Sequence, residues 1–185
     1  MGLPRKRVPG ELVAGLTGRY RAHGDPREVS CVIACSFGYR RSPVGTEPGV
    51  VNDYLARSAI GLFPGKPVLA QVEVAECINR LPGGPERCIP VGQVPDDADR
   101  YVSTSRVLRQ CRGIMAERGW STAAIVAHPY HLPRVDVTAG RLGIDTVAPA
   151  GLAPLWDRAS AQVWTRSPGL WQVRELFVGL ALIFS

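Results

Sequence analysis

Lysine is almost absent from this 185-residue chain: two of its 22 basic residues are lysines, Lys6 and Lys66, and the rest are arginines. The formal net charge is +6, but the arginines form no dense run and no aromatic residues are interleaved with them. We therefore expect no nucleic-acid partner. Arginine suits the fork-shaped recognition of phosphate or carboxylate, although a genome rich in GC codons produces the same bias.

Paired cysteine motifs are also missing. The five cysteines are odd in number and no CxxC spacing occurs among them. Cys31 and Cys35 lie inside an apolar run, where a free thiol behaves as a small hydrophobic side chain. The pattern predicts reduced thiols and a cytoplasmic protein.

Long hydrophobic runs are absent. The apolar run Leu176–Phe184 is shorter than the ~20 residues that a membrane-spanning helix needs. The basic N-terminus is not followed by the apolar segment of a signal peptide. We expect no membrane partner, and we expect the C-terminal run to be a buried closing helix or strand.

The 45% of apolar residues argues against disorder, and the length suits one domain with its own core. Residues 1–26 are rich in Gly, Pro and Arg and are predicted to form an N-terminal arm, either packed on the domain or loosely ordered. Residues 27–185 are predicted to form a single domain. Three of the four tryptophans lie in the last 30 residues, where we expect them to form core or a homodimer contact.

Short apolar runs alternate with helical patterns between Val29 and Val147, which is typical of βαβ units and a mainly parallel sheet. The segment Tyr39–Gly49 between the first strand and the first helix is predicted to be a loop. The predicted strands are Val29–Cys35, Pro67–Val72, Cys88–Val91, Ala123–Ala127 and Ile144–Val147. The predicted helices are 51–62, Glu73–Leu81, a segment from a Ser103 or Thr104 cap to Gly119, and Arg134–Leu142.

Polar residues follow the carboxyl ends of several of these strands, and parallel strands bring those ends to one edge of the sheet. The residues are Ser36 and Gly38 after the first strand, Glu73 after the second, and His128 and His131 after the fourth. We therefore predict a ligand site at this edge.

The turn from His128 to Arg134 is the centre of the predicted site. His131 and Arg134 lie three residues apart, so in a helical turn they share a face and can hold a phosphate or carboxylate with the helix N-terminus. Alternatively, His131 caps the turn and Arg134 pairs with Asp136 or Asp145. His128 is a second donor or a general base. No third ligand accompanies the two histidines except Glu73, and we predict no metal site.

The remaining candidates each have a functional and a structural interpretation. Glu73 is a general base or holds a ribose hydroxyl, or is simply an acidic residue favoured in the first turn of a helix. Ser36 and Gly38 allow backbone amides to approach a phosphate, or form a plain tight turn, since neither a P-loop nor a GxGxxG motif is present. Asn52 is a candidate ligand contact.

The turn and the strand before it resemble the YdcF-like family, whose members carry an H-x-x-R turn after a strand. The resemblance spans about Val29 to Val147. Its matching segments are His131-Leu-Pro-Arg134, Ser103-Thr104, Ser36-Phe-Gly38 and Glu73. It implies an α/β fold of Rossmann-like type, with three layers and a mainly parallel sheet, and a ligand at the strand tips. Nucleotide-type ligands, including S-adenosylmethionine as a cofactor, are implied for such proteins.

The predicted function is an enzyme that hydrolyses or transfers a group on a small anionic, nucleotide-like or phosphorylated substrate. Its catalytic residues would be Glu73, His128 and His131. Its ligand-binding residues would be Ser36, Gly38, Asn52, Ser103, Thr104 and Arg134. The alternative is a non-catalytic nucleotide or S-adenosylmethionine binding module. A third possibility is a scaffold with an unused pocket, because Arg106 and Val107 stand where the family often has Glu-Asn.

Overall fold

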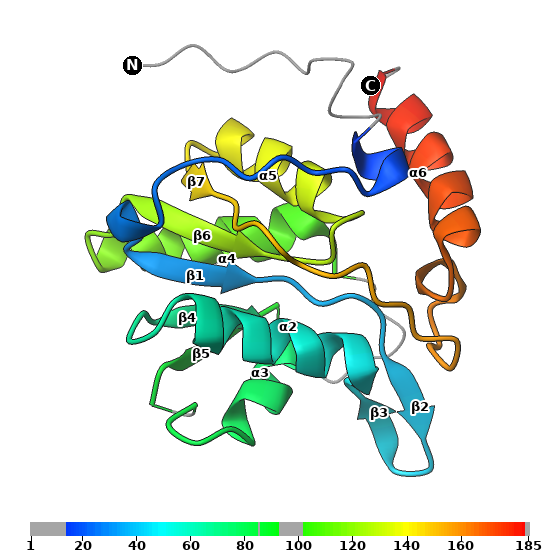
Figure 1. The fold of residues 1–185 in the computed structure, drawn as a ribbon, viewed down its shortest axis with the longest axis horizontal. Coiled ribbons are helices and arrows are strands. Elements are labelled where there is room, and N and C mark those ends of the chain that lie inside the picture. Colours follow the sequence, from blue (N-terminus) through cyan, green and yellow to red (C-terminus); the bar gives the residue numbers. More distant parts are fainter. Residues whose placement is uncertain (1–13, 85, 93–101, 184–185) are drawn as a thin grey trace.

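The computed structural model describes residues 14–84, 86–92 and 102–183 of the chain. Its centre is a five-stranded sheet in the order β5-β4-β1-β6-β7, in which every neighbouring pair is parallel (Figure 1). The strands are β1 (Cys31–Ala34), β4 (Val68–Gln71), β5 (Cys88–Val91), β6 (Thr122–Val126) and β7 (Asp145–Val147). The predicted α/β fold with a parallel sheet is confirmed.

Strand β1 lies in the middle of the sheet and pairs with β4 on one side and with β6 on the other. The chain moves outward from β1 through β4 to β5, then returns to the far side of β1 to form β6 and β7. The connections beside β1 therefore leave in opposite directions. In a doubly wound sheet, this reversal opens a crevice at the carboxyl ends of the strands.

Helices cover both faces, as a Rossmann-like three-layer fold requires. The side chains of β1 alternate: Val32 and Ala34 face a cluster with α2 (Gly49–Leu62) and α3 (Val72–Asn79). Cys31 and Ile33 face the opposite cluster, with α4 (Thr104–Glu117) and α5 (Leu132–Arg141). All four of these β1 side chains are fully buried, which explains why the strand is apolar throughout.

The C-terminal run forms part of helix α6 (Pro168–Ile183) rather than a strand. The expectation that this run is buried was wrong for its first two residues, because Leu176 and Phe177 are exposed. Residues 149–167 lead back from β7 along the side of the molecule to α6 (Figure 1). Trp171 of α6 is buried against the α2 and α3 side of the core, and Trp156 and Trp164 pack on the same cluster. The tryptophan-rich tail is thus part of the core. None of the described helices is both long and apolar enough to cross a bilayer.

Two expectations need correction. The segment Tyr39–Gly49 is not a plain loop, because β2 (Arg40–Ser42) and β3 (Gly45–Glu47) form an antiparallel hairpin. The β3 residues are exposed, so no apolar alternation reveals the strand. The helix expected to reach Leu81 ends at Asn79.

The described part of the N-terminal arm packs on the domain. Residues 14–17 form a helical turn, and the carbonyl of Leu16 accepts a hydrogen bond from Gln172 of α6 at 2.8 Å. Further along, His23 forms an isolated antiparallel bridge with Ala148. The first 13 residues of the predicted arm lie outside the described residues.

Candidate functional site

A small cavity of about 70 Å³ lies at the carboxyl ends of β1, β4 and β6, at the reversal of strand order. Six of the nine residues predicted for the site line it. These six are Ser36, Gly38, Glu73, Thr104, His131 and Arg134. The cavity wall also contains Phe37, Tyr39, Gln71, Val102, Gln162, Trp164, Thr165, Trp171 and Arg174. Of the five residues expected to converge at the strand tips, four line the cavity and His128 does not.

Glu73 lies in the first turn of α3, directly after β4. Its Oε2 atom is buried and has no hydrogen-bond partner among the described residues. Burial raises the pKa of the carboxyl above its ordinary value, while its own backbone amide and the Ser36 side chain oppose that shift. Burial without an ion pair makes the carboxyl a weaker acid than an exposed glutamate, which suits proton transfer.

His131 is the residue immediately before α5, but its side chain makes no capping hydrogen bond to the helix. Its Nε2 lies 3.2 Å from Oγ1 of Thr104 at the start of α4. Its Nδ1 is buried without a partner in the described structure. Burial, followed by the positive charges of Arg134 and Arg174, lowers the pKa of this imidazole well below its ordinary value. His131 is therefore a neutral ring with one unused nitrogen.

Arg134 extends from the first turn of α5 toward α6. Its Nη1 lies 2.5 Å from Oε1 of Glu175, and Nη1 of Arg174 lies 3.2 Å from the same oxygen. The alternative expectation that Arg134 pairs with Asp136 or Asp145 was wrong. The acid that pairs with it is Glu175 of α6, which lies 41 residues further along the chain. Two guanidinium groups thus converge on one buried carboxylate beside the cavity.

Aromatic rings hold these two arginines in place. The guanidinium carbon of Arg134 lies 5.2 Å from the Trp171 ring centroid. That of Arg174 lies 5.0 Å from the Trp164 ring and 5.5 Å from the Trp171 ring. These distances are within the range of cation–π attraction. Sequence reasoning missed Arg174, although it and Glu175 are the only charged residues within the long apolar helix α6.

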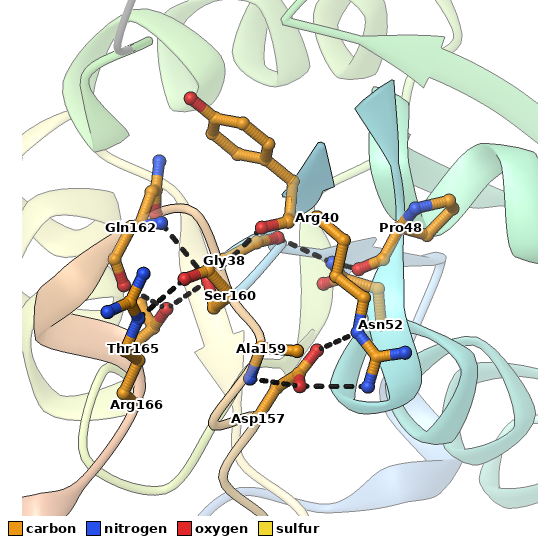
Figure 2. A network of polar contacts seen from close by, with 11 residues as sticks. Gly38, Arg40, Pro48, Asn52, Asp157, Ala159, Ser160, Gln162, Thr165 and Arg166 are labelled. Atoms are coloured by element: carbon orange, nitrogen blue, oxygen red, sulfur yellow. Dashed lines mark hydrogen bonds and ion pairs between the residues drawn. The ribbon is translucent and has the colours of Figure 1, made fainter. Parts of the chain in front are cut away.

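Asn52 supports the site without lining it. Its Oδ1 accepts a hydrogen bond from the Phe37 amide at 2.8 Å. Its Nδ2 donates to the carbonyls of Gly38, at 2.7 Å, and Pro48 (Figure 2). The residue is fully buried. Its role is to fix the backbone after β1, so that the cavity edge at Phe37 and Gly38 keeps its shape.

The segment from Asp157 to Arg166 also holds the chain that follows β1 in place, through contacts with Tyr39 and Arg40. Asp157 pairs with Arg40 through two hydrogen bonds of 2.7 and 2.9 Å, and the carbonyl of Tyr39 accepts from the Ser160 hydroxyl at 3.2 Å (Figure 2). A side chain at Gly38, where φ is +78°, would place its Cβ 2.5 Å from Oγ1 of Thr165. The close approach of these two segments therefore requires glycine at this position.

His128 does not line the cavity. Its ring stacks on Phe37 with centroids 3.8 Å apart, its Nε2 donates to the carbonyl of Leu155 at 2.8 Å, and its Nδ1 accepts from the Tyr130 amide at 3.3 Å. Burial lowers its pKa to about 3. With both nitrogens engaged and no charge, His128 fits a structural role better than that of a general base. Ser103 is likewise outside the cavity and caps α4 through the Arg106 amide.

The structure also shows the state of the cysteines and the arrangement of side chains that could hold a metal ion. No disulfide joins the five cysteines, all of which belong to the described residues, and four of the five are buried. Within residues 14–84, 86–92 and 102–183, no group of three or more His, Cys, Asp or Glu side chains is arranged to hold a metal ion.

Comparison of the chain with models of known families, with curated proteins and with solved structures gave no match.

Proposed function

We propose that this protein is an enzyme that hydrolyses or transfers a phosphoryl or similar anionic group at the cavity above β1 and β6. The observation that carries the proposal is the set of groups around one small space. Arg134 and Arg174 supply guanidinium groups, while Glu73 and His131 supply ionisable groups with a buried, unpartnered atom each. Unsatisfied buried polar atoms are costly, and native proteins keep them mainly where they have a function.

Anion binding has three sources of support in this geometry. The guanidinium groups of Arg134 and Arg174 can form charge-assisted hydrogen bonds to an oxyanion. The N-terminal turns of α4 and α5 also adjoin the cavity, through Thr104 and His131, and add the positive end of each helix dipole. The resemblance of the 128–134 turn to the YdcF-like family supports the same interpretation.

The cavity volume limits which part of the substrate enters. Pockets that enclose a whole drug-sized ligand measure roughly 300–1,000 Å³, whereas this cavity measures about 70 Å³. That space suits one phosphoryl or carboxylate group and not an entire nucleotide or S-adenosylmethionine. We infer that the anionic group is bound in the cavity and that the rest of the substrate lies outside it.

The chemical roles follow from position. Arg134 and Arg174 hold the anion, and Glu73 and His131 are the candidates for moving a proton at the reacting oxygen. His128 is left out, because both of its ring nitrogens contact the backbone. Asn52, Gly38 and the 157–166 segment position the loop after β1 and do not take part in the chemistry.

Binding of inorganic phosphate and turnover of a panel of phosphomonoesters test the proposal. Losing a charge-assisted hydrogen bond costs about 1.5–3 kcal/mol, so Arg174→Ala should weaken binding roughly ten- to a hundredfold. Arg134→Lys should restore only part of the affinity of Arg134→Ala, since an ammonium cannot form two parallel hydrogen bonds. Arg141→Ala, at an exposed position in the last turn of α5 and outside the cavity wall, is the matched control.

Three outcomes are informative. Binding with turnover that falls in Glu73→Gln and His131→Ala supports an enzyme. Binding without turnover of any ester points to the non-catalytic binding module instead. No binding of phosphate or of any ester would remove the cavity as an anion site.

A further inference from the structure

Among the described residues that line the cavity, Glu73 is the one that bears a carboxyl group. Within the described residues, no Lys, Arg or His nitrogen lies within 4 Å of its carboxyl oxygens. Besides burial, three groups shift the pKa of this carboxyl. Its own backbone amide and the Ser36 side chain lower the pKa, and the charge of Glu76 on the same helix raises it.

The other charged or titratable groups of the cavity belong to different elements. Tyr39 comes from the loop after β1, His131 and Arg134 come from α5, and Arg174 comes from α6. Glu175 accepts from both arginines just behind the wall. An oxyanion held by the arginines would therefore share a cavity of about 70 Å³ with the carboxyl of Glu73.

We propose that the cavity takes up its oxyanion together with one proton, and that Glu73 holds this proton as a neutral acid in the complex. The inference rests on the proposed function and deepens it, because it assigns Glu73 the role of proton donor rather than base. Two negative charges in one small, poorly solvated site repel each other, and protonation of one of them relieves the repulsion. The burial of Glu73 already moves its carboxyl in this direction in the free protein.

The substrate class follows from the same proton balance. A phosphate monoester has a second pKa of about 6, so it can bring the proton into the site itself. The proton can then pass from the ester oxygen to the Glu73 carboxylate, which breaks one O–H bond and forms another, so no proton is drawn from solvent. A sulfate monoester carries one charge and inorganic sulfate carries two, and neither holds a proton at neutral pH, so the binding of either must draw the proton from solvent. The site therefore suits phosphomonoesters better than sulfate esters.

Calorimetric titration with sodium sulfate measures this directly, because sulfate does not titrate in the range studied. Proton uptake is obtained by repeating the titration in buffers of different ionisation enthalpy, from about pH 5 to about pH 9. We expect uptake approaching one proton between the pKa of Glu73 in the free protein and its higher pKa in the complex. In that window the Kd for sulfate should rise about tenfold per pH unit.

Two variants locate the proton. Glu73→Gln keeps the shape of the side chain but cannot ionise, so its sulfate Kd should not depend on pH and its binding should take up no proton. Glu117→Gln, at an exposed position at the C-terminal end of α4 and outside the cavity wall, should behave as the unmodified protein. Inorganic phosphate should remain bound to higher pH than sulfate in the unmodified protein.

Distinct results would overturn the inference. Sulfate binding with no proton uptake across the whole range contradicts it, while leaving the anion site intact. Uptake that persists in Glu73→Gln assigns the proton to His131 and also contradicts it. If neither sulfate nor phosphate binds at any pH, the proposed function fails and this inference fails with it.

Discussion

Nη1 of Arg134 on α5 lies 2.5 Å from Oε1 of Glu175 on α6, and the two side chains are 10% and 9% exposed. The pair joins the helix after β6 to the C-terminal helix and places Arg134 at the cavity. Arg134 therefore holds two helices together and also lines the cavity, so the structural and the ligand-binding interpretations of this residue are compatible.

Removal of Arg134 should destabilise the fold. Arg134→Ala leaves a buried Glu175 with Arg174 as its remaining paired arginine, and breaking a buried ion pair costs roughly 3–5 kcal/mol. The double variant Arg134→Ala/Glu175→Ala should lose less than the sum of the two single variants. Urea unfolding of all three measures the coupling. Arg57→Ala, which breaks an exposed pair with Asp53, should cost about 0–1 kcal/mol, and strictly additive losses at 134 and 175 would refute the coupling.

Glycine at position 38 should be required for both folding and binding. Gly38→Ala forces a side chain into a left-handed backbone, with its Cβ 2.5 Å from Thr165 and 2.6 Å from Ser160. Gly65→Ala is a matched control, because Gly65 has nearly the same φ of +76° but nothing within 4 Å. The control should lose about 1 kcal/mol from backbone strain alone. We expect Gly38→Ala to lose clearly more and to weaken phosphate binding; equal losses would mean that the contact with Thr165 and Ser160 relaxes freely.

Acid should destabilise the protein through His128. Its pKa is about 3 in the folded protein, below the ordinary 6.5, because it is buried. Between these values the unfolded chain binds the proton and the folded protein does not. Stability therefore falls as the pH drops below 6.5, by up to ~1.4 kcal/mol per pH unit. His131, whose pKa is also lowered, adds to the effect in the same direction.

The variant His128→Phe separates this contribution. It keeps a ring against Phe37 but loses the hydrogen bonds to Leu155 and Tyr130. Urea unfolding at pH 8 should show a loss of about 1–3 kcal/mol for the unpaired backbone groups. The loss of stability between pH 6.5 and pH 4 should become smaller than in the unmodified protein. The same pH dependence in both proteins would show that His128 is not its source.

The thiols should react slowly in the folded protein. Burial raises the pKa of Cys31 and of Cys35 to about 12 and that of Cys77 and of Cys88 to about 11. Since the thiolate is the reactive form, a disulfide reagent should modify the native protein far more slowly than the denatured one. Five thiols should be counted in denaturant. Cys88, the part-buried one, should react first, and fewer than five groups in denaturant would indicate a disulfide.

The fold was predictable because its signals are local. The strands β1 and β6 read as short apolar runs, since both of their faces are covered by helices. Ser103 was predicted as a candidate cap of α4, and in the structure its hydroxyl caps that helix. The hairpin β2–β3 escaped prediction, because a small exposed hairpin is held by backbone hydrogen bonds that leave no hydrophobic pattern.

The sequence and the geometry of parallel sheets determined the part of the site that follows the strands of the sheet. Ser36, Glu73 and His131 follow strands that point the same way, so they had to meet at one edge. Their distance along the chain is irrelevant to that argument. The periodicity of the apolar residues identifies the strands and helices, and this is enough to place these side chains at one edge of the sheet.

Only the tertiary structure decided which residues of helix α6 belong to the site and which of the two histidines lines the cavity. Helix α6 brings Arg174 and Glu175 to the cavity by packing on the core through Trp171, and its docking depends on shape rather than on any local signal. The same packing chose between the two histidines of the turn. His128 and His131 are three positions apart, yet the ring of His128 is stacked inside the core while His131 lines the cavity. Sequence determines which side chains reach a turn, but the neighbours that pack around the turn determine which nitrogen atoms remain unpaired.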